Sequence, residues 1–336
     1  MSRIHPVFLD QAWDSQVLEV SGFLPLVGFG GPFLLSAPES EKRGSLSGEA
    51  TKMPAKHELS PEILGSVSGV PARRVPIAPR RHLERRGQAR EYAVRLAHSP
   101  EEKAQAYRLR FLVFNVELNE GLESAYATGY DTDEFDGVCD HLVVEHRPTG
   151  KIIATYRMQT GPAAATNIGY YSEREFDFSP FEPLRNSLVE VGRAAILKEH
   201  RTFEVLNLLW KGLAAYAVES GGRYLIGCSS FASQDPAEGM ELYRQLEAFL
   251  APLDLRTRPQ NGFGLASSEQ TNAVGVAAPR LLRAYLNLGA RICGEPALDR
   301  EFKTIDFLTL LDLEALSPVA RARFLDAAWS ADGCRS

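Results

Sequence analysis

The chain has 336 residues, of which 44% are hydrophobic and 24% are charged, and its formal net charge is −6. This composition is that of a globular protein with one large core or two small ones. The sequence contains no run of the roughly 18 apolar residues that a transmembrane helix needs, and the apolar stretch at 22–36 is a poor signal peptide because two prolines interrupt it.

The first 90 residues differ in composition from the rest. They hold nine of the 20 prolines and nine of the 27 glycines without a sustained period, so we expect residues 1–90 to form a disordered Pro/Gly/Arg-rich tail. Residues 73–90 carry seven arginines and one acid, which could contact an acidic partner or peripherally contact the inner membrane, or form a solvated linker. The remainder carries about nine net negative charges, which argues against nucleic-acid binding.

The four cysteines lie far apart and form no CxxC pair. They predict neither a disulfide framework nor a zinc site, and they favour a reducing cytoplasm. The sequence also lacks GxSxG, a Walker loop, HExxH, and a GxGxxG that follows a strand. We therefore expect no metal and no tightly bound cofactor.

Order is predicted to begin near residue 92. Ser99-Pro100-Glu101-Glu102 has the pattern of a capping box and predicts a helix to about Leu118. Residues 141–146 and 151–159 are rich in β-formers and flank RPTG, which predicts an antiparallel hairpin. LVEVGRAAI at 188–196 predicts the next strand.

Alternating helices and strands are predicted after residue 200. The predicted segments are a helix with an apolar stripe from Leu206 to Ala217, a strand at 223–231, a helix that starts at Asp235-Pro236, a helix at 279–289 and a strand within 301–313. Strands that are followed by alternating helices and strands predict an α/β (α+β) domain over residues 91–330, with a mixed sheet and helices on both faces.

The strand LVEVGRAAI carries two charges, Glu190 and Arg193, in an apolar run. Because side chains alternate in a regular strand, these two residues should point to opposite faces. A bulge centred on Gly192 would bring them onto one face and leave an N–H beside them. The alternative is an edge strand with two solvated charges.

Several separated blocks resemble known acyltransferases. RLRFLVF at 108–114, DEFD at 133–136, Arg157 in ATYRM and EVGR at 190–193 match the order and spacing of the acyl-homoserine-lactone synthases, which belong to the GNAT superfamily. Longer blocks, among them CDHLVV, LVEVGRAAI, GCSSFASQDP and DREFKTIDFL, resemble more closely the L-ornithine N-alpha-acyltransferases of ornithine-lipid synthesis. The resemblance covers about residues 92–315.

This resemblance implies a GNAT-like fold, a mixed and mostly antiparallel central sheet that is split after the fourth strand. It also implies transfer of a long (3-hydroxy)acyl chain from acyl carrier protein, the co-substrate and partner, to the α-amine of ornithine. The product would be lyso-ornithine lipid. The alternatives are another N-acyl amino acid or a homoserine lactone, and a non-enzymatic lipid-binding or cytolytic protein.

Homoserine-lactone synthesis ranks lower because Trp13, Trp210 and Trp329 lie outside residues 115–136, where that family places an aromatic wall.

The resemblance also implies roles for residues at the strand LVEVGRAAI. The bulge at Gly192 would offer an N–H to the developing oxyanion. Glu190, beside Arg193, would take the proton of the amine, directly or through water, because an amine with a pKa of about 10 is almost fully protonated at neutral pH. The alternative is that Glu190 forms a structural ion pair with Arg193. Tyr243 would protonate the leaving thiolate or simply pack in the core.

Other charged residues are candidates for substrate and carrier binding. Arg110 and Arg157 would bind the amino-acid carboxylate, and Asp133 and Asp136 the distal ammonium, or these residues serve the scaffold. The loop at 196–206 lacks the glycine-rich phosphate motif of acetyl-coenzyme A users. Its cations would bind the pantetheine phosphate or an acidic carrier, or lie in a solvated turn; they are Lys198, His200 and Arg201.

Overall fold

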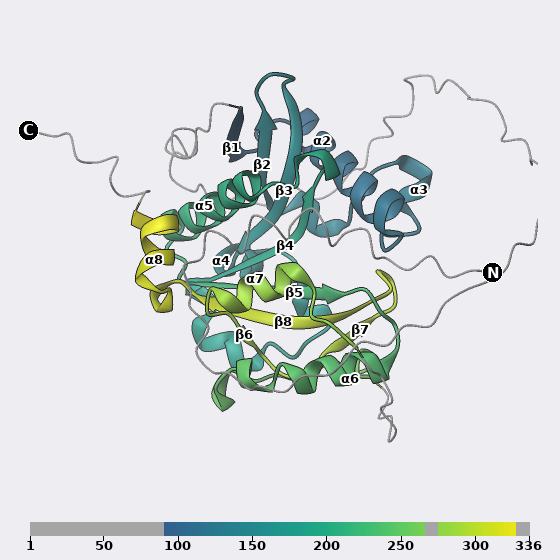
Figure 1. Ribbon diagram of the computed structural model, residues 1–336, viewed down its shortest axis with the longest axis vertical. Coiled ribbons are helices and arrows are strands. Elements are labelled where there is room, and N and C mark those ends of the chain that lie inside the picture. Colours follow the sequence, from purple (N-terminus) through teal and green to yellow (C-terminus); the bar gives the residue numbers. More distant parts are fainter. Residues whose placement is uncertain (1–90, 266–274, 327–336) are drawn as a thin grey trace, which may run out of the picture.

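The computed structural model describes residues 91–265 and 275–326. These residues form one eight-stranded sheet in the order β1-β2-β3-β4-β5-β8-β6, with β7 paired to β8 (Figure 1). Only β4 and β5 are parallel neighbours, which confirms the predicted mixed, mostly antiparallel sheet. The predicted tail, residues 1–90, lies outside the described residues, and the domain boundaries 91 and 330 stay predictions.

The strands are β1 (Tyr92–Leu96), β2 (Asp140–His146), β3 (Lys151–Thr160), β4 (Leu188–Ile196), β5 (Tyr224–Phe231), β6 (Arg291–Ile292), β7 (Ala297–Asp299) and β8 (Thr304–Asp312). The predicted hairpin is confirmed as β2 and β3, which pair antiparallel. No sequence pattern predicted β1, β6 and β7. They are short, and each exists as a strand through its pairing with a neighbour.

The longer helices are α2 (Pro100–Arg110), α5 (Phe203–Glu219), α6 (Pro236–Gln245) and α7 (Arg280–Asn287). Short helical segments are α3 (Ala125–Thr128), α4 (Gly161–Thr166), α8 (Pro318–Arg321), η4 (Glu134–Gly137), η5 (Tyr171–Arg174), η6 (Ser179–Ser187), η7 (Lys198–His200), η8 (Glu247–Phe249), η9 (Leu253–Leu255) and η10 (Leu313–Ala315). Within the described residues, no helix combines the length and the apolar character that crossing a bilayer requires.

The capping box predicted at Ser99 is confirmed. The Ser99 side chain accepts from the Glu102 N–H, and the Glu102 carboxylate accepts from the backbone of Ser99. The helix continues to Leu118 as expected, but its second half is a π-helix, η3 (Phe111–Leu118), which ends at Asn119 with a positive φ of 57°. A second π-helical segment, η11 (Ala322–Asp326), follows α8.

Helices cover both faces of the β1–β4 half of the sheet. Leu142 and Val144 of β2 belong to the apolar cluster that contains α5, whereas Val143 belongs to the cluster that contains α2. Because neighbouring residues of a strand point to opposite faces, α5 and α2 lie on opposite sides of the sheet. We call these the α5 face and the α2 face.

The sheet is split between β4 and β5, as predicted, and the split begins after the first third of β4. β4 pairs with β5 only over Leu188–Glu190, opposite Tyr224–Ile226. The remaining residues of β4 have no β5 partner in this ladder, and Figure 1 shows β1–β4 and β5–β8 as two halves that part there. A Cβ at Gly227 would overlap the carbonyl oxygen of Val191, so the backbones approach closely where the split begins.

This close approach predicts that Gly227→Ala is destabilising. The clash involves a backbone atom that cannot rotate away, so we expect a loss of about 1–3 kcal/mol in the free energy of unfolding, measured by urea denaturation. Gly264→Ala is the control, because a Cβ there would meet no atom within 4 Å. Equal stability of the two variants would show that the strands separate readily at this point.

Candidate active site

A cavity of about 340 Å³ occupies the split between β4 and β5. Residues of both strands line it, Glu190–Ala194 from β4 and Leu225–Ser230 from β5. Because successive residues of these strands face opposite sides, the cavity reaches both faces of the sheet. The split therefore opens a passage through the sheet at the point where the two strands part.

The two sides of the cavity differ in chemistry. On the α5 face the lining is apolar and includes Trp210, Leu213, Leu225, Leu311 and Phe324, which pack in or against the main core cluster. On the other face the lining includes the polar side chains of Ser172, Glu190, Arg193, Cys228, Ser230 and Asp306 beside apolar Ile226 and Phe302. The cavity can hold an apolar chain on one side of the sheet and a charged molecule on the other.

β4 carries a bulge, as predicted, but one residue later than expected. Thr155 of β3 pairs with Ala195 and Arg157 pairs with Gly192, so two residues of β4 oppose one of β3. The bulged residue is Arg193, whose φ is 52°, and not Gly192. Val191 and Ala194 pack toward the α5 face. Their placement leaves Glu190 and Arg193 on the opposite face, which is the outcome that the sequence analysis expected from a bulge.

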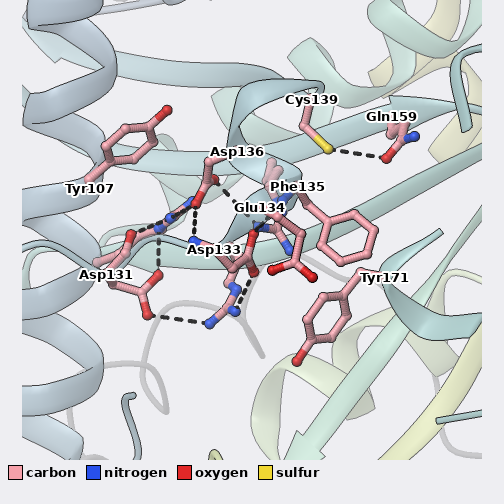
Figure 2. Close-up of polar contacts among 12 residues, drawn as sticks. Tyr107, Asp131, Asp133, Glu134, Phe135, Asp136, Cys139, Gln159 and Tyr171 are labelled. Carbon is pink, nitrogen blue, oxygen red and sulfur yellow. Dashed lines mark hydrogen bonds and ion pairs between the residues drawn. The ribbon is translucent and has the colours of Figure 1, made fainter. Parts of the chain in front are cut away.

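Six buried side chains of alternating charge form a closed ring beside the bulge. They are Arg110, Asp131, Arg193, Asp133, Arg157 and Asp136. Figure 2 shows the three aspartates, which converge from the segment that leads into η4 and from η4 itself.

Every member of this charge ring pairs with two neighbours. Asp131 lies 2.8 Å from Arg110 Nε and 3.3 Å from Arg193. Asp133 lies 2.8 Å from Arg193 and 2.5 Å from Arg157. Asp136 closes the ring, 2.7 Å from Arg110 and 3.4 Å from Arg157. Three positive and three negative charges cancel inside the protein.

The ring changes the interpretation of four predicted substrate ligands. Arg110, Asp133 and Asp136 do not line the cavity, and each is paired within the ring. Their pairing favours the scaffold role, which was the alternative, and substrate contact by these three residues stays a prediction. Arg157 lines the cavity together with Arg193, so contact of Arg157 with a substrate carboxylate stays a prediction.

Glu190 is held by hydrogen bonds and not by an arginine. Tyr171 N–H donates to its Oε2 at 2.9 Å, and Ser172 donates to its Oε1 from N–H at 2.8 Å and from Oγ at 2.7 Å. Burial raises the pKa of the Glu190 carboxyl, and these hydrogen bonds partly oppose the rise. The alternative of a Glu190–Arg193 ion pair is not what the structure shows, because Arg193 pairs with Asp131 and Asp133.

The remaining predicted residues lie away from the cavity lining. Tyr243 of α6 packs against another apolar cluster, as its alternative role required. His200 Nδ1 lies 3.0 Å from the hydroxyl of Tyr92. Arg201 donates to Glu117 at 2.5 and 2.7 Å, and Lys198 is exposed. The structure therefore does not bring the cationic loop into the cavity.

Several residues of the site were not predicted from the sequence. Asp131 is fully buried in the ring, but only the adjacent DEFD was singled out. Asp306 is a carboxylate inside the apolar strand β8, and a carboxylate inside an apolar strand is also what singled out Glu190 in β4. Glu120 lines the cavity, and burial, with a smaller contribution from Asp306, raises the pKa of its carboxyl to about 7. No local pattern marks Ser172.

The charge ring predicts that Asp136→Asn strongly destabilises the fold. The change leaves Arg110 and Arg157 with a buried excess charge, so we expect a loss of about 3–5 kcal/mol in the free energy of unfolding, measured by urea denaturation at pH 7. Glu134→Gln is the control, because Glu134 pairs with Arg174 at the surface and should cost less than about 1 kcal/mol.

The pH dependence of the free energy of unfolding gives a second measure of the contribution of Asp136. Hydrogen bonds and charge from Arg110 hold the pKa of Asp136 well below its usual range against the effect of burial. A carboxyl with a depressed pKa stabilises the fold above its unfolded pKa, and this contribution is lost as the pH falls through the folded pKa. The difference between wild type and Asp136→Asn should therefore be constant above about pH 4, the unfolded pKa of an aspartate, then shrink progressively, and vanish only as the pH falls through the much lower folded pKa.

Comparison with known proteins places the chain among acyltransferases. Residues 109–211 match the family described as Acetyltransferase (GNAT) domain. In solved structures, the AHL synthase LasI has a TM-score of 0.42 at 12% identity, covering 70% of this chain and 95% of that one. The N-acyl amino acid synthase FeeM from uncultured soil microbes has a TM-score of 0.40 at 14% identity, covering 71% and 99%.

Curated relatives are more similar in sequence. The L-ornithine N(alpha)-acyltransferase of Rhodobacter capsulatus is 31% identical over 237 residues, which cover 67% of this chain and 92% of the relative. The enzyme of the same name from Brucella abortus is 31% identical over 242 residues, with 67% and 85% coverage. The chain therefore belongs to the family of L-ornithine N(alpha)-acyltransferases and is an acyltransferase with a GNAT domain.

Proposed function

We propose that the protein transfers a long (3-hydroxy)acyl chain from acyl carrier protein to the α-amine of ornithine, forming lyso-ornithine lipid. The observation that carries this proposal is the two-sided cavity in the split sheet. The apolar lining on the α5 face suits the acyl chain, and the polar lining suits a small amino acid. The relatives named above support ornithine as the acceptor.

The reaction requires attack of the α-amine nitrogen on the thioester carbonyl carbon. The C–N bond forms, the C–S bond breaks, and the pantetheine sulfur leaves as a thiolate. The bulge of β4 lines the cavity between its two sides, at Gly192 and Arg193. A backbone N–H directed at the carbonyl oxygen there would stabilise the oxyanion.

Glu190 is proposed as the base, and Ser172 as the group through which it acts. Ser172 lines the cavity, and its hydroxyl donates to Glu190 at 2.7 Å. The amine proton passes to Ser172 Oγ as the hydroxyl proton passes to the Glu190 carboxylate. Burial raises the pKa of that carboxyl, which brings its basicity closer to the operating pH and suits a general base.

The proton route predicts that Glu190→Gln and Ser172→Ala both lower kcat by about 10². The KM for the acyl donor should change little, because neither residue lies on the apolar side. Exposed Glu182→Gln is the matched control. Mass spectrometry of the N-acyl product measures turnover, and circular dichroism checks the fold. Near-normal turnover in a folded Glu190→Gln variant would exclude Glu190 as the base.

A carrier-protein donor predicts a salt-dependent KM. Lys198 is exposed beyond the end of β4, so Lys198→Glu should raise the KM for acyl carrier protein about two- to fivefold and leave kcat unchanged. Raising the salt concentration should act in the same direction. Arg201 is a less clean probe because it is paired with Glu117.

Lys151→Glu is the control for this charge reversal, since Lys151 is also exposed. Acyl-coenzyme A and acyl carrier protein are compared as donors at the same acyl chain length. Equal use of both donors, without an effect of salt or of Lys198→Glu, would contradict electrostatic recognition of a carrier.

A further inference from the structure

A second group of buried carboxylates includes two residues on the polar side of the cavity, Asp299 and Asp306, and one neighbour behind the lining, Glu175. We call Glu175, Asp299 and Asp306 the acidic cluster; each is buried, with at most 5% of its surface exposed. Asp299 and Asp306 lie on the same face of the β7–β8 pair, since Ala297 is the register partner of Asp306. No ion pair among residues 91–265 and 275–326 includes any of the three.

An unpartnered oxygen marks this cluster as a site. Glu175 Oε1 is buried and has no hydrogen-bond partner among the described residues. The carboxylates of Glu175 and Asp306 and the Cys228 sulfur lie within 4.8 Å of one another. Asp306, Asp299 and Cys228 also line the cavity. A group that enters the cavity can therefore reach the carboxyl oxygens of Asp299 and Asp306; Glu175 does not line the cavity, but its carboxyl group lies within 4.8 Å of that of Asp306.

The acidic cluster adjoins the residues proposed to accept the amine proton. The Cys228 sulfur lies 3.5 Å from Ser172 Oγ and 3.9 Å from Glu175 Oε2, and Ser172 Oγ lies 2.7 Å from Glu190. A molecule with one amine at Ser172 would place a short aliphatic arm along Cys228, and the arm would end among the carboxylates.

We propose that Glu175, Asp299 and Asp306 bind the side-chain ammonium of the diamino-acid acceptor and so select ornithine over monoamino acids. This inference rests on the proposed function, whose acceptor carries two amines. It also replaces the expected role of Asp133 and Asp136, which the charge ring occupies.

The titration of the cluster agrees with such a role. Burial, followed by repulsion from Asp306 and Asp299, raises the pKa of Glu175 well above its usual range. Burial and Asp299 raise the pKa of Asp306 to about 6. A bound ammonium would lower both pKa values, because a nearby positive charge favours the ionised carboxylates.

Hydrogen-bonding capacity favours an ammonium over a metal ion. An ammonium group has three N–H donors, which match the three carboxylates. Thr304 already donates to Asp306 at 2.9 Å, and Ser230 also hydrogen-bonds to it. The thiol of Cys228 is a poor metal ligand here, because burial raises its pKa well above the usual value and a thiol binds metal as the thiolate.

The test compares ornithine with norvaline, which has the same carbon chain without the second amine. Asp306→Asn and Glu175→Gln should each lower kcat/KM for ornithine about 10- to 100-fold, mostly through KM, as expected for losing a charged hydrogen bond. The kcat/KM for norvaline should stay within about threefold, so the preference for ornithine collapses. Exposed Asp254→Asn is the matched control.

Binding is measured in parallel by thermal shift, with full-length protein and either free amino acid. Ornithine should raise the Tm of wild type but not of Asp306→Asn, and norvaline should raise the Tm of neither protein.

If wild type acylates ornithine and both variants keep the preference for ornithine over norvaline, the inference is wrong and the proposed function stands. If wild type neither acylates nor binds ornithine, both are wrong. A Tm rise with Zn²⁺ or Mg²⁺ that Asp306→Asn abolishes would make the cluster a metal site and overturn the inference.

Discussion

The closed ring of three arginines and three aspartates is the interaction on which the geometry of the active site depends. It joins α2, the segment leading into η4, β3 and β4 through buried charges that cancel. Arg193, the bulged residue of β4, has a φ of 52°, a region that costs a non-glycine residue about 1 kcal/mol or more. Its two ion pairs hold it there, since releasing them would leave Asp131 and Asp133 each with one partner fewer.

Neutrality of the ring determines which charges the cavity presents. Arg157 and Arg193 line the cavity, but their charges are already balanced by the aspartates behind them. The carboxyl groups of Glu190, Asp299 and Asp306 form no ion pair among the described residues, although Arg157 lies near Glu190 and Arg193 near Asp306. In a medium of low effective dielectric constant an unbalanced charge acts strongly. The polar side of the cavity therefore has more carboxyl groups than its two arginines, Arg157 and Arg193, can pair.

Local signals made most of the fold predictable, whereas long-range pairing did not. Ser99 with Glu102 and Asp235 with Pro236 fix helix starts through contacts within a few residues, and both predictions are confirmed. The strand β6 has two residues and no pattern of its own; β8 defines it. Likewise five of the six ring residues were singled out in the sequence, but the pairing within the ring spans up to 62 positions, as between Arg193 and Asp131, the member that was missed. Sequence spacing cannot show whether an arginine faces a substrate or an aspartate.

The two carboxylates inside apolar strands illustrate this limit most clearly. Burying a carboxylate costs several kcal/mol unless hydrogen bonds or a charge compensate for the lost water. Glu190 is compensated from within the chain by three hydrogen bonds from Tyr171 and Ser172. Asp306 receives only neutral hydroxyl donors and lies beside two other carboxylates. An acceptor with a positively charged side chain would pair with these carboxylates. An acceptor without that charge would leave them buried and unpaired. The free-energy cost of burying a carboxylate would therefore select the charged substrate.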